Sequence, residues 1–315
     1  MDNTKKNFKV FVAGATGMVG SAIKRRLVKD GYTVPAGPVP RVDLREQQAA
    51  RNLLQELSPD WVFLAAAKVG GIYANNTYPA DFIYDNIMIQ TNVIHASYLA
   101  GVKKLMFLGS SCIYPRLSDQ PIKETELLSG YLEPTNEPYA VAKIAGIVTA
   151  RSYNRQHGTH FISVMPTNLY GPHDNYNLED SHVVPALIRK THEAKLAEAD
   201  YVKIWGTGKP LREFLHVDDL ADACVFLMET YDSSEIVNIG TGVDITIMEL
   251  ALTVKEVVGF KGEIRFDESM PDGVPRKLLD ISRITDLGWK PSIPLKEGIA
   301  STYAWYLENE ERAKK

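Results

Sequence analysis

Short apolar runs alternate with amphipathic segments through the first half of the chain. Apolar runs of about four to eight residues bounded by turn residues are typical of strands buried on both faces. Such runs cover residues 8–13, 61–67, 104–108 and 161–165, and a weaker one covers 32–36. Helical patterns lie between them, over residues 21–29, 46–57, 81–99 and 139–157. This alternation predicts an α/β fold with a doubly wound, parallel, Rossmann-type sheet and right-handed crossovers.

The pattern becomes less regular after Pro172. Short strand-like runs near residues 202–205, 212–216, 237–239 and 263–266 mix with helical patterns at 183–195, from 220, at 247–258 and at 295–309. We therefore expect a dinucleotide-binding domain over residues 1–170 and a smaller, mixed α/β substrate domain over 171–315. We expect a segment near residues 214–241 to pack back on the Rossmann sheet.

A glycine-rich turn lies between the first predicted strand and the first predicted helix. Its sequence is Gly14-Ala-Thr-Gly-Met-Val-Gly20, with the spacing G-x-x-G-x-x-G. The first glycines permit a tight turn and close approach of a phosphate, and the third lets the helix pack against the strand. The helix N-terminus then faces the pyrophosphate. The turn predicts a dinucleotide site, with a plain βα turn as the alternative.

The end of the second predicted strand normally distinguishes NAD from NADP. An acidic residue there binds the ribose 2′-hydroxyl, whereas an arginine binds a 2′-phosphate. This chain has the proline-rich sequence Pro35-Ala-Gly-Pro-Val-Pro-Arg41, in which Arg41 is the only base and no acid is present. Asp43 comes soon after and could reach the adenine, or could be a solvated loop residue. These residues leave the choice between NAD and NADP open.

Candidate catalytic side chains follow the predicted strand 104–108. If the backbone stays extended there, Ser110 and Cys112 point to the same side. Tyr139 and Lys143 are four residues apart on a predicted helix and therefore share a face. An ammonium near a phenol lowers the pKa of the phenol, which suits proton donation to a carbonyl at ordinary pH.

Each of these residues also has a structural interpretation. Ser110 could be a strand-end cap, Cys112 a small core residue, and Tyr139 with Lys143 an exposed pair on an amphipathic helix. The proximity of all four in the predicted fold favours a catalytic site.

The composition excludes several classes of protein. The chain has 315 residues, 45% hydrophobic and 23% charged, with a net charge of −4, so neither nucleic acid nor an anionic membrane is expected as a partner. No apolar run approaches about 18 residues and the first residues lack a signal core, so we expect a cytoplasmic location. The two cysteines, Cys112 and Cys224, exclude a disulfide framework. No metal site is expected.

Several longer motifs match a known family. They are Ala65-Ala-Ala-Lys-Val-Gly-Gly71, Gly109-Ser-Ser-Cys-Ile-Tyr-Pro115, Met165-Pro-Thr-Asn-Leu-Tyr-Gly-Pro-His-Asp-Asn175, Arg212-Glu-Phe-Leu-His-Val-Asp-Asp219 and Pro271-Asp-Gly-Val-Pro-Arg-Lys-Leu278. Through them the chain resembles, nearly end to end, the extended short-chain dehydrogenase/reductases, and within them the GDP-L-fucose synthase family.

The resemblance implies a role for each of three groups of residues. The catalytic group would be Ser110, Tyr139 and Lys143 for reduction, with Cys112 and His182 as base and acid for epimerisation. The cofactor would contact Gly14, Ala15, Thr16, Gly17, Met18, Val19, Gly20, Arg41, Leu108, Gly109, Ser110, Ser111, Lys143, Pro166, Thr167, Asn168, Leu169 and His182. The GDP-sugar would contact Lys190, Trp205, Arg212 and Asp272.

The implied reaction is 3,5-epimerisation and NADPH-dependent 4-keto reduction of GDP-4-keto-6-deoxy-mannose. The ordinary pKa of a cysteine is about 8.5, so a modest shift would bring the pKa of Cys112 near neutrality and suit it to act as the base. A colitose-forming synthase acting on the 3,6-dideoxy ketosugar and a catalytically idle nucleotide sensor are the alternatives. By analogy with the superfamily, residues 81–99 and 139–157 would form a homodimer interface.

Two departures from the family pattern concern the ligands. Lys190 stands where arginine is common, which keeps the charge but loses the bidentate fork. Ala15-Thr16 stands where many members have His-Arg, whose arginine holds the 2′-phosphate of NADP. NADP remains the expected cofactor, with NAD use possible.

Overall fold

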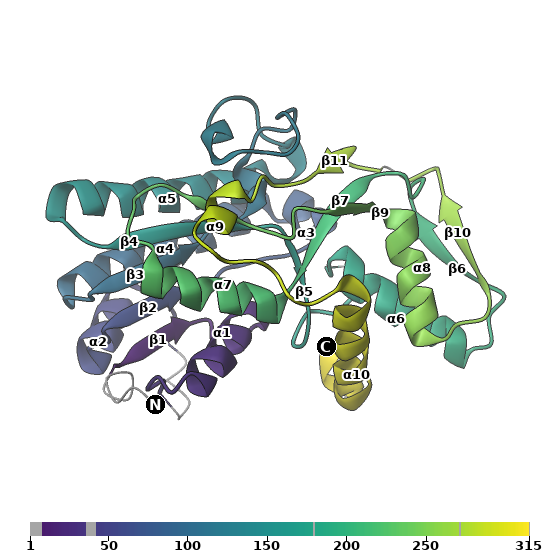
Figure 1. The fold of residues 1–315 in the computed structure, drawn as a ribbon, viewed down its shortest axis with the longest axis horizontal. Helices are drawn as coiled ribbons and strands as arrows, with labels where there is room; N and C mark the ends of the chain where they lie inside the picture. Colours follow the sequence, from purple (N-terminus) through teal and green to yellow (C-terminus); the bar gives the residue numbers. More distant parts are fainter. Residues whose placement is uncertain (1–7, 36–41, 179, 271, 315) are drawn as a thin grey trace.

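Five parallel strands form the central sheet of the molecule (Figure 1). The computed structural model describes residues 8–35, 42–178, 180–270 and 272–314. The strands are β1 (Val10–Ala13), β2 (Trp61–Leu64), β3 (Lys104–Leu108), β4 (Phe161–Pro166) and β8 (Val237–Ile239), in the order β1-β2-β3-β4-β8. All but the ends of these strands are buried, as their apolar sequences predict.

Helices cover both faces of this sheet (Figure 1). One face carries α1 (Met18–Lys29) and α7 (Val217–Thr230), and the other carries α2 (Gln47–Leu57), α4 (Pro79–Leu99) and α5 (Glu137–His157). The side chains of β1 alternate accordingly, with Val10 and Val12 in one core and Phe11 and Ala13 in the other. The predicted doubly wound α/β fold is confirmed.

A second group of elements lies beside the sheet (Figure 1). Strands β5 (Asn168–Tyr170), β7 (Leu211–His216), β9 (Asp244–Thr246) and β11 (Arg276–Lys277) form one small sheet, and β6 (Tyr201–Trp205) pairs with β10 (Glu263–Asp267). Helices α6 (Val183–Leu196), α8 (Ile247–Val258) and α10 (Leu295–Ala313) pack on them around a third core. A short helix, α9 (Ser282–Asp286), follows β11.

The chain returns to the central sheet after β7. Helix α7 packs against α1, and β8 pairs with β4 through Val164 and Val237. Residues 214–241 thus supply an outer helix and an edge strand to the first sheet. The division into domains at residue 170 stays a prediction.

Two predicted strands differ from the structure. The strand predicted over 61–67 ends at Leu64; Ala65 still donates a hydrogen bond of 3.0 Å to Ala13, but β1 then turns away at Gly14 and offers no further partner. The strand predicted over 32–36 is reduced to one parallel bridge between Lys9 and Thr33, and residues 36–41 lie outside the described part. Helix α3 (Ile72–Thr77), which was not predicted, precedes α4.

Candidate active site

The glycine turn lies where the strand order divides. Thr33 bridges to one side of β1 and β2 pairs on the other, and α/β sheets bind ligands at this kind of switch point. Gly14 has a φ of +85°, and a Cβ there would lie 2.8 Å from the backbone nitrogen of Ala66. A Cβ at Gly20 would run into the carbonyl of Gly14. Glycine is therefore required at both positions.

This turn leaves the start of α1 free for an anion. Gly17 is the N-cap residue, without a side-chain cap, and α1 has no acidic residue in its first turn. The first amides of a helix have no intrahelical partner and attract negative charge. A pyrophosphate therefore fits the residues present. The contacts predicted for Ala15, Thr16, Met18 and Val19 stay predictions, and Arg41 lies outside the described residues.

Four predicted catalytic residues come together at the end of β3. Ser110 follows the strand, and its hydroxyl accepts a hydrogen bond of 3.3 Å from the amide of Cys112. Lys143, on α5, donates a hydrogen bond of 2.8 Å to the carbonyl of Leu108. Tyr139 precedes Lys143 by one turn, and the lysine Nζ lies 5.7 Å from the centroid of its ring. Strand β3 and helix α5 thus bring together residues that are about thirty positions apart in the sequence.

The backbone at Cys112 differs from the extended form that we predicted. Residues Ser111–Ile113 form a 3₁₀ turn, η2, with Ser110 as its N-cap. The alternation of side chains expected of a strand therefore does not apply here. The 3₁₀ turn itself brings Cys112 to the hydroxyl of Ser110, because the cap folds back on the first amides of the turn.

The pKa values at this cluster correct a second prediction. Burial raises the pKa of Tyr139 above its ordinary value of 10.0, the charge of Cys112 raises it further, and a hydrogen bond with Ser110 opposes both effects. Burial lowers the pKa of Lys143 to about 8. The prediction that Lys143 lowers the pKa of Tyr139 is wrong for this structure, because desolvation outweighs the attraction of a cation that is bound to Leu108. Tyr139 therefore keeps its proton at neutral pH.

Cys112 likewise departs from the expectation of a nearly neutral pKa. The residue is 8% exposed, and burial raises the pKa of its thiol. The nearby charge of Lys277, the hydroxyl of Ser110 and the charge of Lys143 oppose this effect. The thiol is therefore protonated at neutral pH. Once the thiolate forms, the nearby charges of Lys277 and Lys143 stabilise it.

Lys277 is a site residue that the sequence did not single out. It lies in β11, where it pairs in register with Arg212 of β7. Burial lowers its pKa, and the charge of Cys112 opposes this effect. A lysine in a two-residue strand carries no pattern of its own, so only tertiary structure could reveal its position near Cys112.

His182 is the N-cap residue of α6, and its side chain makes no cap hydrogen bond. The imidazole keeps exposed surface, yet surrounding protein desolvates it and lowers its pKa below 6.5, so it is neutral at pH 7. The loop before it is fixed to the glycines after β2 by a hydrogen bond of 2.8 Å from Gly71 to the carbonyl of Asp180. Within the described residues, no hydrogen bond or ion pair joins His182 to Cys112 or Tyr139.

The predicted substrate residues lie in the second group of elements. Nζ of Lys190 lies 5.6 Å from the ring centroid of Trp205, whose side chain is 59% exposed. Both carboxylate oxygens of Asp272 accept hydrogen bonds from Thr207, at 2.7 and 2.8 Å. The charge of Asp272 also acts on Arg212. Asp272 therefore holds the loop after Trp205, and its contact with substrate stays a prediction.

The segment after β4 is held by neighbouring strands. The amide of Thr167 donates to the carbonyl of Ile239 at 2.9 Å, and the side chain of Asn168 donates to the carbonyl of Glu213 at 2.8 Å. These bonds fix residues 166–169 at the carboxyl end of β4, beside the end of β3. This is the place where the cofactor contacts of Pro166 and Leu169 are predicted.

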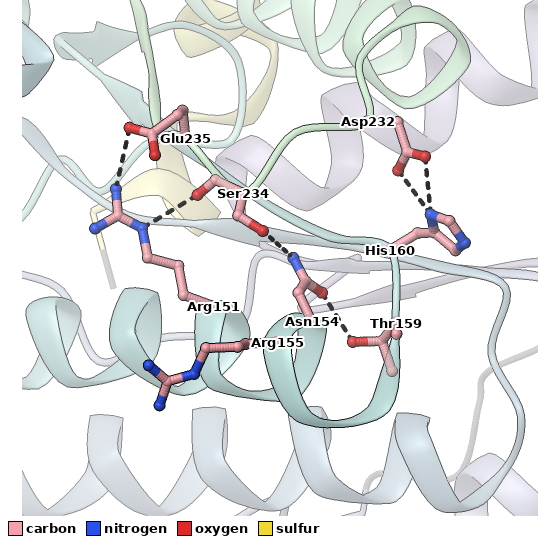
Figure 2. Close-up of a pocket in the computed structure, with 9 residues that line it drawn as sticks. Arg151, Asn154, Arg155, Thr159, His160, Asp232, Ser234 and Glu235 are labelled. Atoms are coloured by element: carbon pink, nitrogen blue, oxygen red, sulfur yellow. Dashed lines mark hydrogen bonds and ion pairs between the residues drawn. The ribbon is translucent and has the colours of Figure 1, made fainter.

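A cavity of about 540 Å³ lies elsewhere, at the end of α5 (Figure 2). Its side chains pair with one another: Arg151 with Glu235 at 3.8 Å, and His160 with Asp232 at 2.8 Å. None of the predicted site residues lines it. It therefore lies apart from the predicted catalytic cluster and is not the candidate active site.

Two other kinds of feature are absent from the described ranges. No group of three or more His, Cys, Asp or Glu side chains in them is arranged to hold a metal ion. Their helices also include none with the length and apolar character that crossing a bilayer requires.

Comparison with known proteins gives a consistent result. Residues 10–240 match the NAD dependent epimerase/dehydratase family. GDP-L-fucose synthase 1 from Arabidopsis thaliana is 58% identical, over 96% of this chain and 94% of that protein. GDP-L-colitose synthase from Yersinia pseudotuberculosis is 34% identical, over 95% of this chain and 98% of that protein.

A solved structure agrees with these relatives. The GDP-L-fucose synthetase from Naegleria fowleri bound to NADP superposes with a TM-score of 0.91 at 30% identity, covering 98% of this chain and 97% of that one. The chain therefore belongs to the NAD dependent epimerase/dehydratase family and, within it, to the GDP-L-fucose synthase family.

Proposed function

We propose that this chain converts GDP-4-keto-6-deoxy-mannose to GDP-L-fucose by epimerisation at C3 and C5 and reduction at C4. The observation that carries the proposal is the convergence of Ser110, Cys112, Tyr139 and Lys143 at the end of β3. The 58% identity to a GDP-L-fucose synthase supports this substrate over the 3,6-dideoxy sugar, whose synthase is 34% identical. The intact proton donor also argues against an idle nucleotide sensor.

Epimerisation uses the acidity of the carbons beside the C4 ketone. Cys112, as the thiolate, takes the proton from C3, and the electron pair moves to the ketone oxygen as an enolate. His182 is neutral at pH 7 and must first take up a proton; as the imidazolium it then gives that proton to the opposite face of the carbon, which inverts it. Exchange with solvent then removes the proton from Cys112 and returns one to His182, and the same two steps invert C5. Lys277 and Ser110 favour the thiolate electrostatically. Proton-transfer groups of this kind contribute about 10²–10⁴-fold each.

Reduction uses the other half of the cluster. Tyr139 gives its proton to the C4 oxygen, and Ser110 hydrogen-bonds that oxygen. Lys143 supplies positive charge near the developing alkoxide. The nicotinamide cofactor, when bound, supplies hydride to C4. Its pyrophosphate is assigned to Gly14–Gly20 and the start of α1, which fit it as described above.

NADP is the proposed cofactor. The structural neighbour with a TM-score of 0.91 was solved with NADP. Thr16 stands where an arginine would hold the 2′-phosphate, so the preference over NAD is expected to be modest. The ratio of kcat/KM for NADPH and NADH measures it, and a ratio below one would assign NAD instead.

The proposal extends to assembly and location. Exposed apolar side chains on the packed helices α4 and α5 support a homodimer through these helices; they are Tyr84, Leu99, Val141 and Val148. Light scattering should give twice the chain mass, and a monomer would refute the dimer.

A cytoplasmic location is proposed because the two buried, unpaired cysteines fit a reducing compartment. Fractionation of cells checks it. Residues 1–170 and 171–315 are proposed to form the cofactor and substrate domains. Hydrogen exchange of the whole chain checks this, because NADPH should protect mainly the first range and GDP mainly the second.

The direct test is incubation with the GDP-ketosugar and NADPH, followed by NMR of the product. GDP-L-fucose is expected. A C4-reduced sugar with unchanged C3 and C5 would refute the epimerase activity. If NADPH is not oxidised at all, the whole proposal is refuted.

A further inference from the structure

Glu213 is a fully buried carboxylate beside the proposed substrate residues. It is 0% exposed, lies in β7 and follows Arg212 directly. One carboxylate oxygen accepts hydrogen bonds from the amides of Thr241 and Gly242, at 2.6 and 2.7 Å. The other accepts from the amide of Leu279 at 3.2 Å. Burying a carboxylate costs free energy unless hydrogen bonds offset the cost. Glu213 has such bonds, and through them it fixes the position of the segments that donate to it.

The three backbone amides that donate to Glu213 come from two segments outside β7. Thr241 and Gly242 belong to the turn between β8 and β9, and Leu279 follows β11 by two residues. The turn approaches closely, because a Cβ at Gly240 would run into the carboxylate of Glu213. Glu213 therefore joins β7 to the segment that carries Lys277.

This connection lies next to two residues of the proposed site: Arg212 is a predicted substrate contact, and Lys277 lies near Cys112. Arg212 and Lys277 are direct partners in the β7–β11 register. Side chains alternate along a strand, so Arg212 points to the opposite side of β7 from the buried Glu213. β11 has only two residues, and its pairing with β7 covers only those two positions. The hydrogen bond of Glu213 to Leu279 extends the attachment of this short strand.

We propose that Glu213 is a positioning residue that holds Arg212 and Lys277 in the geometry required by the GDP-sugar. This inference rests on the proposed function. Its connection to the cofactor side is mainly through the backbone: the side chains of Asn168 and Thr167 donate to the backbone carbonyl of Glu213 at 2.8 and 3.4 Å, and these bonds do not need the carboxylate. The hydroxyl of Thr167 also interacts with the carboxylate itself.

The substitution Glu213→Gln tests the proposal. Glutamine keeps the size but replaces one acceptor oxygen with an NH₂ group, which cannot accept from the amides that now bind the carboxylate. We expect KM for the GDP-ketosugar, and Kd for GDP measured by calorimetry, to rise about tenfold or more because Arg212 is a charge-assisted ligand of phosphate. Kd for NADPH should change much less than Kd for GDP, because the backbone bonds of Asn168 and Thr167 to Glu213 remain.

Asp219→Asn is the matched control. Asp219 is 3% exposed and binds the amides of Ser292 and Ile293 at 3.1 and 2.9 Å, so it is also a buried carboxylate that holds a loop. That loop carries none of the proposed site residues. Both variants should lower Tm, but only Glu213→Gln should weaken GDP. Equal effects on GDP affinity, or none in Glu213→Gln, would refute the positioning role.

A second variant covers the case in which Glu213→Gln does not fold. Gly240→Ala places a methyl group against the carboxylate without removing it, and it should weaken GDP in the same direction. Unchanged GDP affinity in Gly240→Ala would overturn the proposal. GDP binding is independent of turnover, so an inactive natural chain would refute the proposed function without deciding the role of Glu213.

Discussion

The ammonium of Lys143 is bonded to the carbonyl of Leu108, at 2.8 Å, rather than directed at the hydroxyl of Tyr139. The lysine also lies 5.0 Å from the centroid of the Phe107 ring, so it is anchored to the end of β3. Lys143 therefore acts on the site through its charge, from this fixed position. Burial lowers its pKa to about 8, which places its titration within the range of a rate measurement.

The rate of C4 reduction should therefore depend on the charge of Lys143. Lysine is cationic below its pKa, so the rate is expected to fall as pH rises through about 8. Single-turnover oxidation of NADPH between about pH 6.5 and 9.5 measures this dependence, and it separates reduction from product release. In Lys143→Arg the charge persists at all these pH values, so the decline near pH 8 should be absent. A natural enzyme whose rate stays constant through pH 9 would contradict the assignment.

Tyr139→Phe should separate the two halves of the reaction. Phenylalanine keeps the ring that packs edge-on against Phe82 at 6.2 Å but removes the hydroxyl. Reduction at C4 is expected to fall about 10²–10⁴-fold, which is the usual contribution of a proton donor. Exchange of the C3 and C5 protons with deuterium from solvent should continue, as followed by NMR. A variant that reduces the ketone normally would exclude Tyr139 as the donor.

Cys112→Ala should have the opposite effect. Without the thiol, entry of deuterium at C3 and C5 should stop, while affinity for NADPH stays unchanged because the glycine turn is untouched. The comparison variant is Cys224→Ala, since Cys224 is a fully buried residue of α7 in the core. It should lose stability but retain exchange. Normal exchange in Cys112→Ala would remove the thiol from the mechanism.

Asp174 predicts a dependence of stability on pH. One of its carboxylate oxygens is buried without a hydrogen-bond partner in the described structure, and burial raises its pKa from 3.8 to about 7. The folded state thus binds this proton more tightly than the unfolded chain. The free energy of unfolding should decrease as pH rises from about 4 to about 7 and then level off.

Asp174→Asn should remove this decrease. At pH 8 the variant is expected to be more stable than the natural chain, by up to about 4 kcal/mol for a shift of about three pKa units. At pH 4 the carboxyl is protonated in the folded state and close to its ordinary pKa of 3.8 in the unfolded chain, so little of the penalty remains and the two proteins should differ little. Urea denaturation at the two pH values measures the difference. Equal stability at pH 8 would show that the carboxylate is hydrated in solution.

The sequence predicts the elements of the catalytic cluster well, for physical reasons. Residues 104–108 are continuously apolar because β3 is buried on both faces, and Tyr139 and Lys143 have helical spacing. The glycine turn is recognisable because a side chain at Gly14 or Gly20 would collide with neighbouring backbone, so glycine is required at both positions.

Other features depend on tertiary packing and could not be predicted. Lys277 reaches the site through the register of a two-residue strand, which leaves no periodic signal. The pKa of Tyr139 depends on how completely neighbouring elements exclude water, and spacing along one helix says nothing about this. The turn at Ser111–Ile113 is fixed by the cap at Ser110 rather than by a change in hydrophobic pattern.

One experiment tests most directly whether a single cluster performs both reactions. The GDP-ketosugar and NADPH are incubated with the natural chain in D₂O, and the product is examined by NMR. The proposed mechanism predicts GDP-L-fucose carrying deuterium at C3 and C5, since both carbons exchange with acid groups equilibrated with solvent. A C4-reduced product that keeps protium at both carbons would contradict it.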